Sequence, residues 1–223
     1  MAVPEPHLVA RDLRRSFQIG GRKLEVLRGI SMEIERGEAV FLVGASGAGK
    51  TTLLYTLAGL ERPEAGTVEF EGERLYSGSS RAQARRRNRQ MGFVFQGYFL
   101  LPELTALENV MLPGMIGRQT DSRSAEESLR SVGLGERMQH LPAELSGGEQ
   151  QRAAIARALV NDPAIVFADE PTGNLDSKTG ETIIDLLLGL VRERQKTLLL
   201  VTHDAGLAQR GDRKLTIADG VLL

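Results

Sequence analysis

A glycine-rich segment of the chain has the residue types and the spacing of a phosphate-binding loop. It runs from Gly44 to Thr51 in the pattern G-x-x-x-x-G-K-T. Glycines let backbone amides converge on phosphate oxygens, Lys50 can reach the β- and γ-phosphates, and the Thr51 hydroxyl can bind Mg²⁺. A glycine-rich turn with a chance lysine is the alternative. The residues expected to bind the nucleotide are Gly44, Ala45, Ser46, Gly47, Ala48, Gly49, Lys50, Thr51 and Thr52.

Two carboxylates follow an apolar run much later in the chain. Ala164–Ala168 is followed directly by Asp169 and Glu170. In phosphate-loop enzymes an aspartate in this place holds Mg²⁺ through water, and the next carboxylate can orient or deprotonate the attacking water. Solvated acids at a strand end are the alternative. Together with the phosphate loop, the pair favours a metal role for Asp169 and a catalytic role for Glu170.

The elements that must position these groups follow from the apolar runs. Ala39–Val43 reads as a buried strand before the loop, and Thr52–Ala58 reads as a helix after it. Continuous apolar runs are typical of parallel strands that are covered on both faces, and they recur at 92–95, 164–168 and 197–201. The sequence therefore predicts an α/β fold, a phosphate-loop core with a mainly parallel sheet.

Other segments have different patterns. The runs at 24–34 and 66–70 alternate in polarity, which predicts an antiparallel β subdomain beside the main sheet. From Leu101 to Leu145 the pattern is helical, with expected breaks at Pro113, Gly117, Gly133 and Pro142. We expect one domain over residues 1–223. Its subdomains are a core of 1–96 and 151–223 and an inserted helical part at 97–150.

A second segment also has the composition of an anion site. Leu145–Arg152 reads L-S-G-G-E-Q-Q-R, and a helical pattern follows it. Ser146 can cap that helix, and the small Gly147 and Gly148 would expose backbone amides at its start. A simple helix cap is the alternative, but it does not explain the paired glycines. A single chain would thus have two phosphate-binding ends and no obvious need for both.

This segment resembles the signature of the ABC ATPases, and the resemblance covers nearly the whole chain, with the motifs in the family's order. It implies ATP hydrolysis by two copies packed head to tail. In that arrangement Ser146, Gly147 and Gly148 of one copy close over ATP held by the phosphate loop of the other. The segment ending at Asp176 resembles the family's D-loop, which implies that Asp176 contacts the opposite phosphate loop.

The resemblance also implies roles for three residues outside these motifs. Gln96 follows an expected strand and resembles the Q-loop glutamine, which would sense Mg²⁺ and the attacking water. His203 follows a second expected strand and matches the family's switch histidine, which contacts the γ-phosphate. Phe17 lies where the family usually has an aromatic residue, often tyrosine, that stacks on adenine. A place in the core is the alternative for Phe17.

The remaining histidines and a basic cluster have plainer interpretations. His7 and His140 lack a comparable context and are expected to be exposed or helix-associated. Arg85–Arg89 has no interleaved aromatic residues, and the formal net charge of the chain is -1. We interpret this cluster as a solvated helix face and do not expect nucleic acid as a partner.

Membrane attachment is expected to depend on other chains. Of the 223 residues 41% are hydrophobic, yet no apolar stretch is long enough to span a bilayer, and Met1–Asp12 lacks a secretory pattern. The chain has no cysteine, which is compatible with a reducing cytoplasm. The resemblance implies a peripheral position on the cytoplasmic face of the inner membrane. It also implies integral membrane permease subunits as partners and no direct contact with the transported substrate.

A groove beside Gln96 is the expected docking place for a short cytoplasmic permease helix. The alternative is that the apolar residues concerned belong to the core of the helical subdomain. They are Phe99, Leu100, Leu101, Leu104 and Leu107.

Two segments indicate a group within the family. Gly92–Val110 and Asp169–Asp176 resemble the lipoprotein-releasing ATPases (LolD) and the related macrolide exporters (MacB), of which we favour the first. A cell-division ATPase that regulates cell-wall hydrolases (FtsE) is the nearest alternative. Soluble ABC ATPases of translation or DNA repair generally carry two ATPase domains or a long coiled-coil insertion, and this chain has neither.

Overall fold

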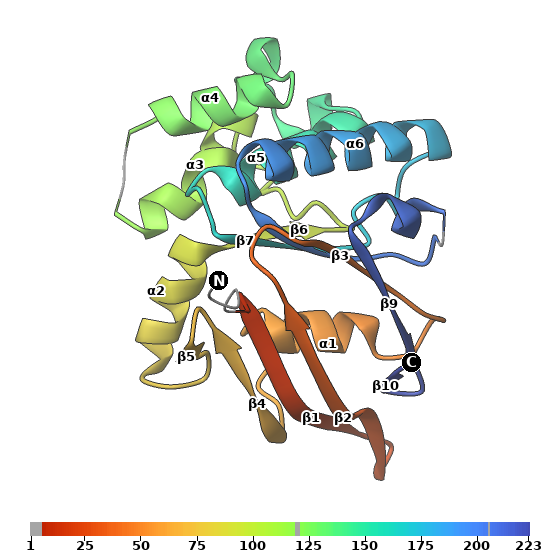
Figure 1. The fold of residues 1–223 in the computed structure, drawn as a ribbon. Coiled ribbons are helices and arrows are strands. Elements are labelled where there is room, and N and C mark those ends of the chain that lie inside the picture. Colours follow the sequence, from red (N-terminus) through yellow and green to blue (C-terminus); the bar gives the residue numbers. More distant parts are fainter. Residues whose placement is uncertain (1–5, 119–120, 205) are drawn as a thin grey trace, which may run out of the picture. The chain divides into compact units, whose positions relative to one another are not determined.

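The computed structural model describes residues 6–118, 121–204 and 206–223, which divide into two compact units. The first unit combines the chain up to Gln83 with Thr197–Leu223, and the second comprises Ala84–Lys196. The helical subdomain expected at 97–150 lies within the second unit, and its boundaries stay a prediction. Figure 1 follows the elements along the chain.

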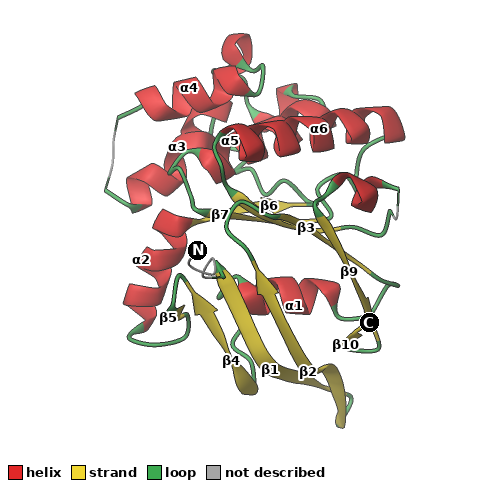
Figure 2. Ribbon diagram, viewed as in Figure 1, coloured by secondary structure: helices red, strands yellow, loops and turns green. Residues whose placement is uncertain are grey.

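One sheet of the first unit is antiparallel and has the strand order β2-β1-β4-β5. β1 (Leu8–Ile19) pairs with β2 (Arg22–Ile34) and β4 (Ala65–Phe70), and β5 (Glu73–Arg74) pairs with β4 (Figure 2). The antiparallel strands predicted at 24–34 and 66–70 are confirmed. β1 is not among the expected strands, because its arginines interrupt the apolar pattern.

The phosphate loop directly follows a parallel strand of the first unit. β3 (Ala39–Val43) is buried throughout and pairs in parallel with β8 (Thr197–Val201) and β9 (Arg213–Ala218). β10 (Val221–Leu222) pairs antiparallel with β9, and a 3₁₀ turn at Leu207–Arg210 precedes β9. α1 (Lys50–Leu57) packs against β8. The strand, loop and helix expected around the loop are confirmed.

His7 is buried, contrary to the expectation of an exposed or helix-associated residue. Only 1% of it is accessible, and its Nδ1 lies 2.6 Å from the Thr197 hydroxyl. The same hydroxyl accepts a hydrogen bond of 2.9 Å from the Gly37 amide. Burial lowers the pKa of His7. The expectation is wrong because His7 directly precedes β1, which pairs on both sides.

The second unit contains two parallel strands, β6 (Met91–Phe95) and β7 (Ile165–Asp169). α5 (Gly147–Leu159) packs against β6, so closely that a β-carbon at Gly92 would lie 2.4 Å from the Ala158 carbonyl oxygen. α2 (Ser80–Gln90) spans the boundary of the units and has no buried residue, which confirms the solvated helix expected around Arg85–Arg89.

The other helices of the second unit pack around α5. α3 (Ala106–Ile116) and α4 (Arg123–Ser131) contact α5 and each other, and α6 (Ser177–Glu193) contacts α5 (Figure 1). Short 3₁₀ turns lie at Gly135–Arg137 and Pro142–Glu144. Among the described helices, none combines the length and apolar character that crossing a bilayer requires.

The break expected at Pro113 is wrong. Pro113 lies inside α3, which continues to Ile116, and the Gly117 amide donates 3.0 Å to the Pro113 carbonyl oxygen. A proline lacks the backbone donor that residue 113 would direct to the carbonyl oxygen of residue 109, so α3 loses that one bond, while the Gly117 amide still closes its last turn. Packing of α3 on its neighbours is sufficient to hold that turn.

Candidate active site

The phosphate loop wraps around the side chain of Lys50. The Lys50 ammonium donates to the carbonyl oxygens of Gly44 at 2.9 Å and Ala45 at 3.0 Å, and the residue is buried. Gly49 precedes α1 in a left-handed conformation, and no side chain caps this helix or places an acid in its first turn. The amides at the start of α1 therefore suit an anion, and the loop residues fit a bound phosphate.

Two loop glycines are required by close packing. A β-carbon at Gly44 would lie 2.3 Å from the Ile217 carbonyl oxygen of β9. Gly49 has a φ of 103°, which other residues rarely adopt, and a β-carbon there would meet the Val26 carbonyl oxygen at 3.0 Å. Ala45, Ser46 and Thr51 are exposed, whereas Ala48 is buried.

His203 emerges at the same sheet edge as this loop. Leu42 of β3 pairs with Val201 of β8, so Gly44 and His203 both come two residues after a matched pair. The carboxyl ends of neighbouring parallel strands lie side by side, and His203 is exposed there. This is the placement expected for a residue that reaches the phosphates.

Phe17 lies on β1 opposite Leu24 of β2 and is half-buried. The Arg15 guanidinium carbon lies 4.8 Å from the centre of its ring, a cation–π contact. One face of the ring is thus already covered within the first unit. The adenine role of Phe17 stays a prediction that depends on its other face.

The acidic residues of the second unit occupy another strand edge. Asp169 ends β7 and is 8% accessible, and it pairs with Phe95 of the parallel strand β6. Glu170 and Gln96 therefore both come one residue after this pair. Glu170 has a φ of 44°, in the left-handed region, where the chain turns sharply away from the strand. The parallel pairing places both residues at the same edge of the two strands.

Gln96 is held by the segment that precedes α6. The side-chain Nε2 of Gln96 donates to Asn174 Oδ1 at 3.3 Å, and the backbone carbonyl oxygen of Gln96 accepts a bond of 3.0 Å from Asn174 Nδ2. A β-carbon at Gly173 would lie 2.5 Å from the side-chain Nε2 of Gln96. Asp176 then caps α6 by accepting from the Thr179 amide at 3.1 Å. Hydrogen bonds from the side chain and then the backbone of Thr179 lower the pKa of Asp176. The Q-loop and the D-loop are thus directly connected.

The signature segment starts α5 beside these two loops. A β-carbon at Gly147 would lie 3.1 Å from the Tyr98 hydroxyl oxygen and 3.3 Å from a Leu175 methyl. One at Gly148 would lie 2.9 Å from a Thr179 methyl. Close packing against the Q-loop and the D-loop therefore accounts for the paired glycines, which a simple cap does not.

Ser146 caps α5 in a reciprocal arrangement with Glu149. The Ser146 oxygen accepts from the Glu149 amide at 3.3 Å, and Glu149 Oε2 accepts from the Ser146 amide at 2.8 Å and from its hydroxyl at 2.7 Å. The hydrogen bonds from Ser146 lower the pKa of Glu149. The S-x-x-E spacing is a known sign of such a cap, so the sequence could have revealed it.

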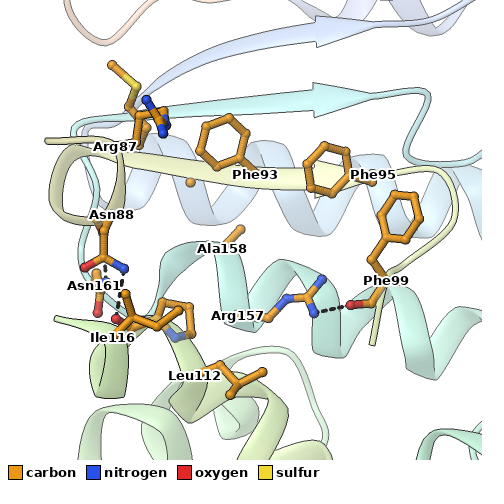
Figure 3. Close-up of a pocket in the computed structure, with 13 residues that line it drawn as sticks. Arg87, Asn88, Phe93, Phe95, Phe99, Leu112, Ile116, Arg157, Ala158 and Asn161 are labelled. Atoms are coloured by element: carbon orange, nitrogen blue, oxygen red, sulfur yellow. Dashed lines mark hydrogen bonds between the residues drawn. The ribbon is translucent and has the colours of Figure 1, made fainter. Parts of the chain in front are cut away.

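Arg157 is a further residue of this site that the motifs do not indicate. Its guanidinium donates to the carbonyl oxygen of Tyr98 at 2.5 Å and to that of Phe99 at 2.5 Å, and Figure 3 shows the bond to Phe99. Tyr98 and Phe99 have φ values of 59° and 47°, an uncommon pair for residues with side chains. Arg157 stabilises this turn from α5. Because 58 residues separate Arg157 from Phe99, no local pattern signals the contact.

Comparison with known proteins identifies the family. The family model described as ABC transporter matches residues 27–173. The chain belongs to this family. The "Lipoprotein-releasing system ATP-binding protein LolD" of Myxococcus xanthus is 50% identical over 216 residues, which are 96% of each chain. The "Uncharacterized ABC transporter ATP-binding protein YbbA" of Escherichia coli is 48% identical over 224 residues, covering 99% of this chain and 98% of the relative.

Solved structures agree with this assignment. The dimeric structure of MJ0796, a bacterial ABC transporter cassette, has a TM-score of 0.89 at 38% identity and covers 96% of each chain. A dimeric post-hydrolysis state of MJ0796 bound to ADP and Pi has a TM-score of 0.88 at 37% identity, with the same coverage. The expected fold is confirmed. The chain is an ATP-binding subunit of an ABC transporter, and it is an ATPase.

The two units divide the expected site residues between them. The first unit brings together the phosphate loop and His203, and it also holds Phe17. The second brings together Gln96, Asp169 and Glu170 at one strand edge, with the signature and Asp176 next to the Q-loop.

Proposed function

We propose that two copies of this chain hold two ATP molecules between them and that hydrolysis drives separate membrane subunits. The supporting observation is that the uncapped start of α1 after the phosphate loop and the glycine-containing start of α5 at the signature lie in different compact units. In the proposed dimer, ATP on the phosphate loop of one copy contacts Ser146, Gly147 and Gly148 of the other. The dimeric MJ0796 cassettes support this arrangement.

Different residues of the chain would bind the nucleotide and catalyse its hydrolysis. The amides of the phosphate loop and Lys50 bind the β- and γ-phosphates, and Phe17 stacks on adenine. Glu170 orients or deprotonates the attacking water, and His203 contacts the γ-phosphate. Charge that develops on the γ-phosphate is stabilised by groups that are already in place, which is the main source of catalysis in phosphoryl transfer.

Mg²⁺ would be held by the Thr51 hydroxyl, by Asp169 through water and by Gln96. These oxygen donors are of the type that Mg²⁺ prefers when phosphates supply its other ligands. When bound, the ion neutralises negative charge on the β- and γ-phosphate oxygens. The hydrogen bonds between Gln96 and Asn174 would connect the metal site to the D-loop, where Asp176 is proposed to contact the partner copy.

The membrane partner would dock at a pocket of about 360 Å³ in the second unit (Figure 3). Phe93, Phe95 and Phe99 form its aromatic side, and Ile116 at the end of α3 is 74% accessible. Arg87 and Arg157 also line it, and none of its lining residues is acidic. A short permease helix with an apolar face and an acidic residue would fit these walls.

The pocket differs from the groove expected from the sequence. Phe99 lines it, whereas Leu100, Leu101, Leu104 and Leu107 are not among its lining residues. Since Arg157 supports the turn at Tyr98 and Phe99, a partner in the pocket would act on the loop that carries Gln96.

The transport task is proposed from the relatives. Several relatives near 50% identity are named for lipoprotein release, which supports this task for the present chain. The chain would then act as a peripheral subunit on the cytoplasmic face of the inner membrane, without touching the substrate itself. A related MacB-type export task is the second candidate, from the resemblance of Gly92–Val110 and Asp169–Asp176 to that group.

Reconstitution with the copurifying membrane subunits tests both the proposed transport task and the proposed docking pocket. We expect ATP-dependent release of a lipoprotein from proteoliposomes, and export of a small molecule without lipoprotein release would contradict the assigned task.

Ile116→Asp should lower the stimulation of ATPase activity by the membrane subunits at least about tenfold, because a buried charge weakens an apolar interface. Met115→Asp is the matched control, since Met115 is 52% accessible and does not line the pocket.

A further inference from the structure

The hydroxyl group of Ser146 is already engaged within its own chain. A serine hydroxyl has one hydrogen to donate, and here it is directed to Glu149 Oε2 at 2.7 Å. The same carboxylate oxygen accepts from the Ser146 amide at 2.8 Å. Two donors that could otherwise face the partner's nucleotide are therefore bound to Glu149.

We propose that Glu149 competes with the γ-phosphate of the partner's ATP for Ser146 and so keeps the affinity of the ATP-bound dimer low. This inference rests on the proposed function, because it requires that the signature closes over the nucleotide of the other copy. To bind the phosphate, the Ser146 hydroxyl must turn away from Glu149. The cost of breaking this bond opposes dimer formation.

Charge acts in the same direction as this competition. Hydrogen bonds from Ser146 keep Glu149 ionised, so a negative charge lies one hydrogen bond away from the proposed phosphate position. The start of α5 is the positive end of the helix, and a carboxylate there offsets the attraction that an incoming phosphate would experience. Arg137 Nε lies 3.3 Å from Glu149 Oε1 and reduces the repulsion without removing it.

The chain contains a matched internal control for this arrangement. Thr105 caps α3 in the same way, with Glu108 Oε2 accepting from the Thr105 amide at 2.8 Å and from its hydroxyl at 2.9 Å. The two caps have the same chemistry, and only the cap of α5 belongs to the signature. A change at Glu108 reproduces the loss of charge at a helix start without touching the proposed dimer interface.

The test measures dimerisation in the Glu170→Gln background, in which hydrolysis does not consume the ATP. Adding Glu149→Gln removes the charge and leaves an amide oxygen that can accept only a weaker, neutral hydrogen bond from Ser146, so Glu149 loses most of its advantage in the competition. We expect the Kd of the dimer with ATP and Mg²⁺ to fall about tenfold, with the gain shrinking at high salt. Adding Glu108→Gln instead should leave this Kd unchanged. Light scattering and sedimentation give the constants, and nucleotide affinity in dilute monomer checks that ATP binding is preserved.

A second variant tests the inference with the opposite sign. Arg137→Gln removes the cation beside Glu149, and half of the Arg137 side chain is exposed, so folding is not threatened. Its dimer with ATP should be weaker by a few-fold, because the carboxylate then repels the phosphate more strongly.

Three outcomes would overturn the inference. A dimer constant that Glu149→Gln leaves unchanged or raises would reject the competition by Glu149, provided that the Glu170→Gln parent dimerises with ATP. An equal gain from Glu108→Gln would show that the effect is not specific to the signature. A parent that stays monomeric at saturating ATP would reject the proposed dimer itself, and the role of Glu149 with it.

Discussion

The starts of α1 and α5 are both proposed to bind phosphate, but they differ in how their amides are satisfied. α1 begins after Gly49 with no side-chain cap and no acid in its first turn. α5 begins with Ser146 and Glu149 in a complete reciprocal cap. The first helix start is open to an anion, whereas the second is closed by residues of its own chain.

This difference indicates an order of binding. A helix start without a side-chain cap gains hydrogen bonds to its backbone amides when phosphate arrives and has no capping side chain to displace. A capped one must exchange bonds that it already has, so its net gain is smaller. ATP is therefore expected to bind first to the phosphate loop of one copy and only afterwards to recruit the signature of the other.

The largest expected effect comes from a change in the phosphate loop at the uncapped start of α1. Lys50→Ala removes the principal positive charge on the β- and γ-phosphates, and hydrolysis should fall by about a thousandfold with weakened nucleotide binding. Steady-state ATPase assays and nucleotide titration measure both effects. Lys214→Ala, at an exposed position on β9, should behave as the parent does. Normal turnover by Lys50→Ala would reject the phosphate-loop assignment.

A somewhat smaller effect is expected when hydrolysis is blocked and both helix starts stay intact. Glu170→Gln keeps the shape of the side chain and removes its basicity, so the chemical step should slow at least about a hundredfold while ATP binding survives. The variant should be monomeric without nucleotide and dimeric with ATP and Mg²⁺ in light scattering. Hydrolysis at the parental rate would exclude Glu170 from catalysis. Glu181→Gln on the exposed side of α6 is the matched control.

The smallest expected effect is a dependence of folding stability on pH, which the capped helix starts have and the start of α1 lacks. Hydrogen bonds from Ser146 and Thr105 lower the pKa of Glu149 and Glu108 below the ordinary value of 4.5. The folded state therefore favours the ionised carboxylates. Their contribution to stability is fully present above pH 4.5 and is lost as the pH falls through the lowered values. α1 has no acid in its first turn and contributes nothing of this kind.

Urea unfolding at a series of pH values measures this contribution. The double variant Glu108→Gln and Glu149→Gln should be less stable than the parent at pH 6, and the difference should shrink as the pH falls below 4.5. A stability difference that is independent of pH would show that the carboxylate charge does not contribute.

The sequence predicts elements best where chemistry and periodicity agree. β3, the loop and α1 are predicted because an apolar run, glycines and a helical pattern follow one another directly. β1 is missed because Arg11 and Asp12 interrupt its alternation, although pairing on both sides fixes it as a strand. Pro113 is misjudged because tertiary packing compensates for the loss of a single helix bond.

The sequence by itself determined which chemical groups the site contains and in which order they occur. Lys50, Asp169, Glu170 and His203 are recognisable because each follows directly on an apolar strand or a glycine loop, and such local spacing is written in the chain.

Only the tertiary structure decided what each group contacts. It shows that His7 is buried against Thr197, 190 residues away. It also shows that Arg157 supports the turn before α3. Such contacts join residues far apart in the chain, and they depend on how strands and helices pack, which no local pattern encodes.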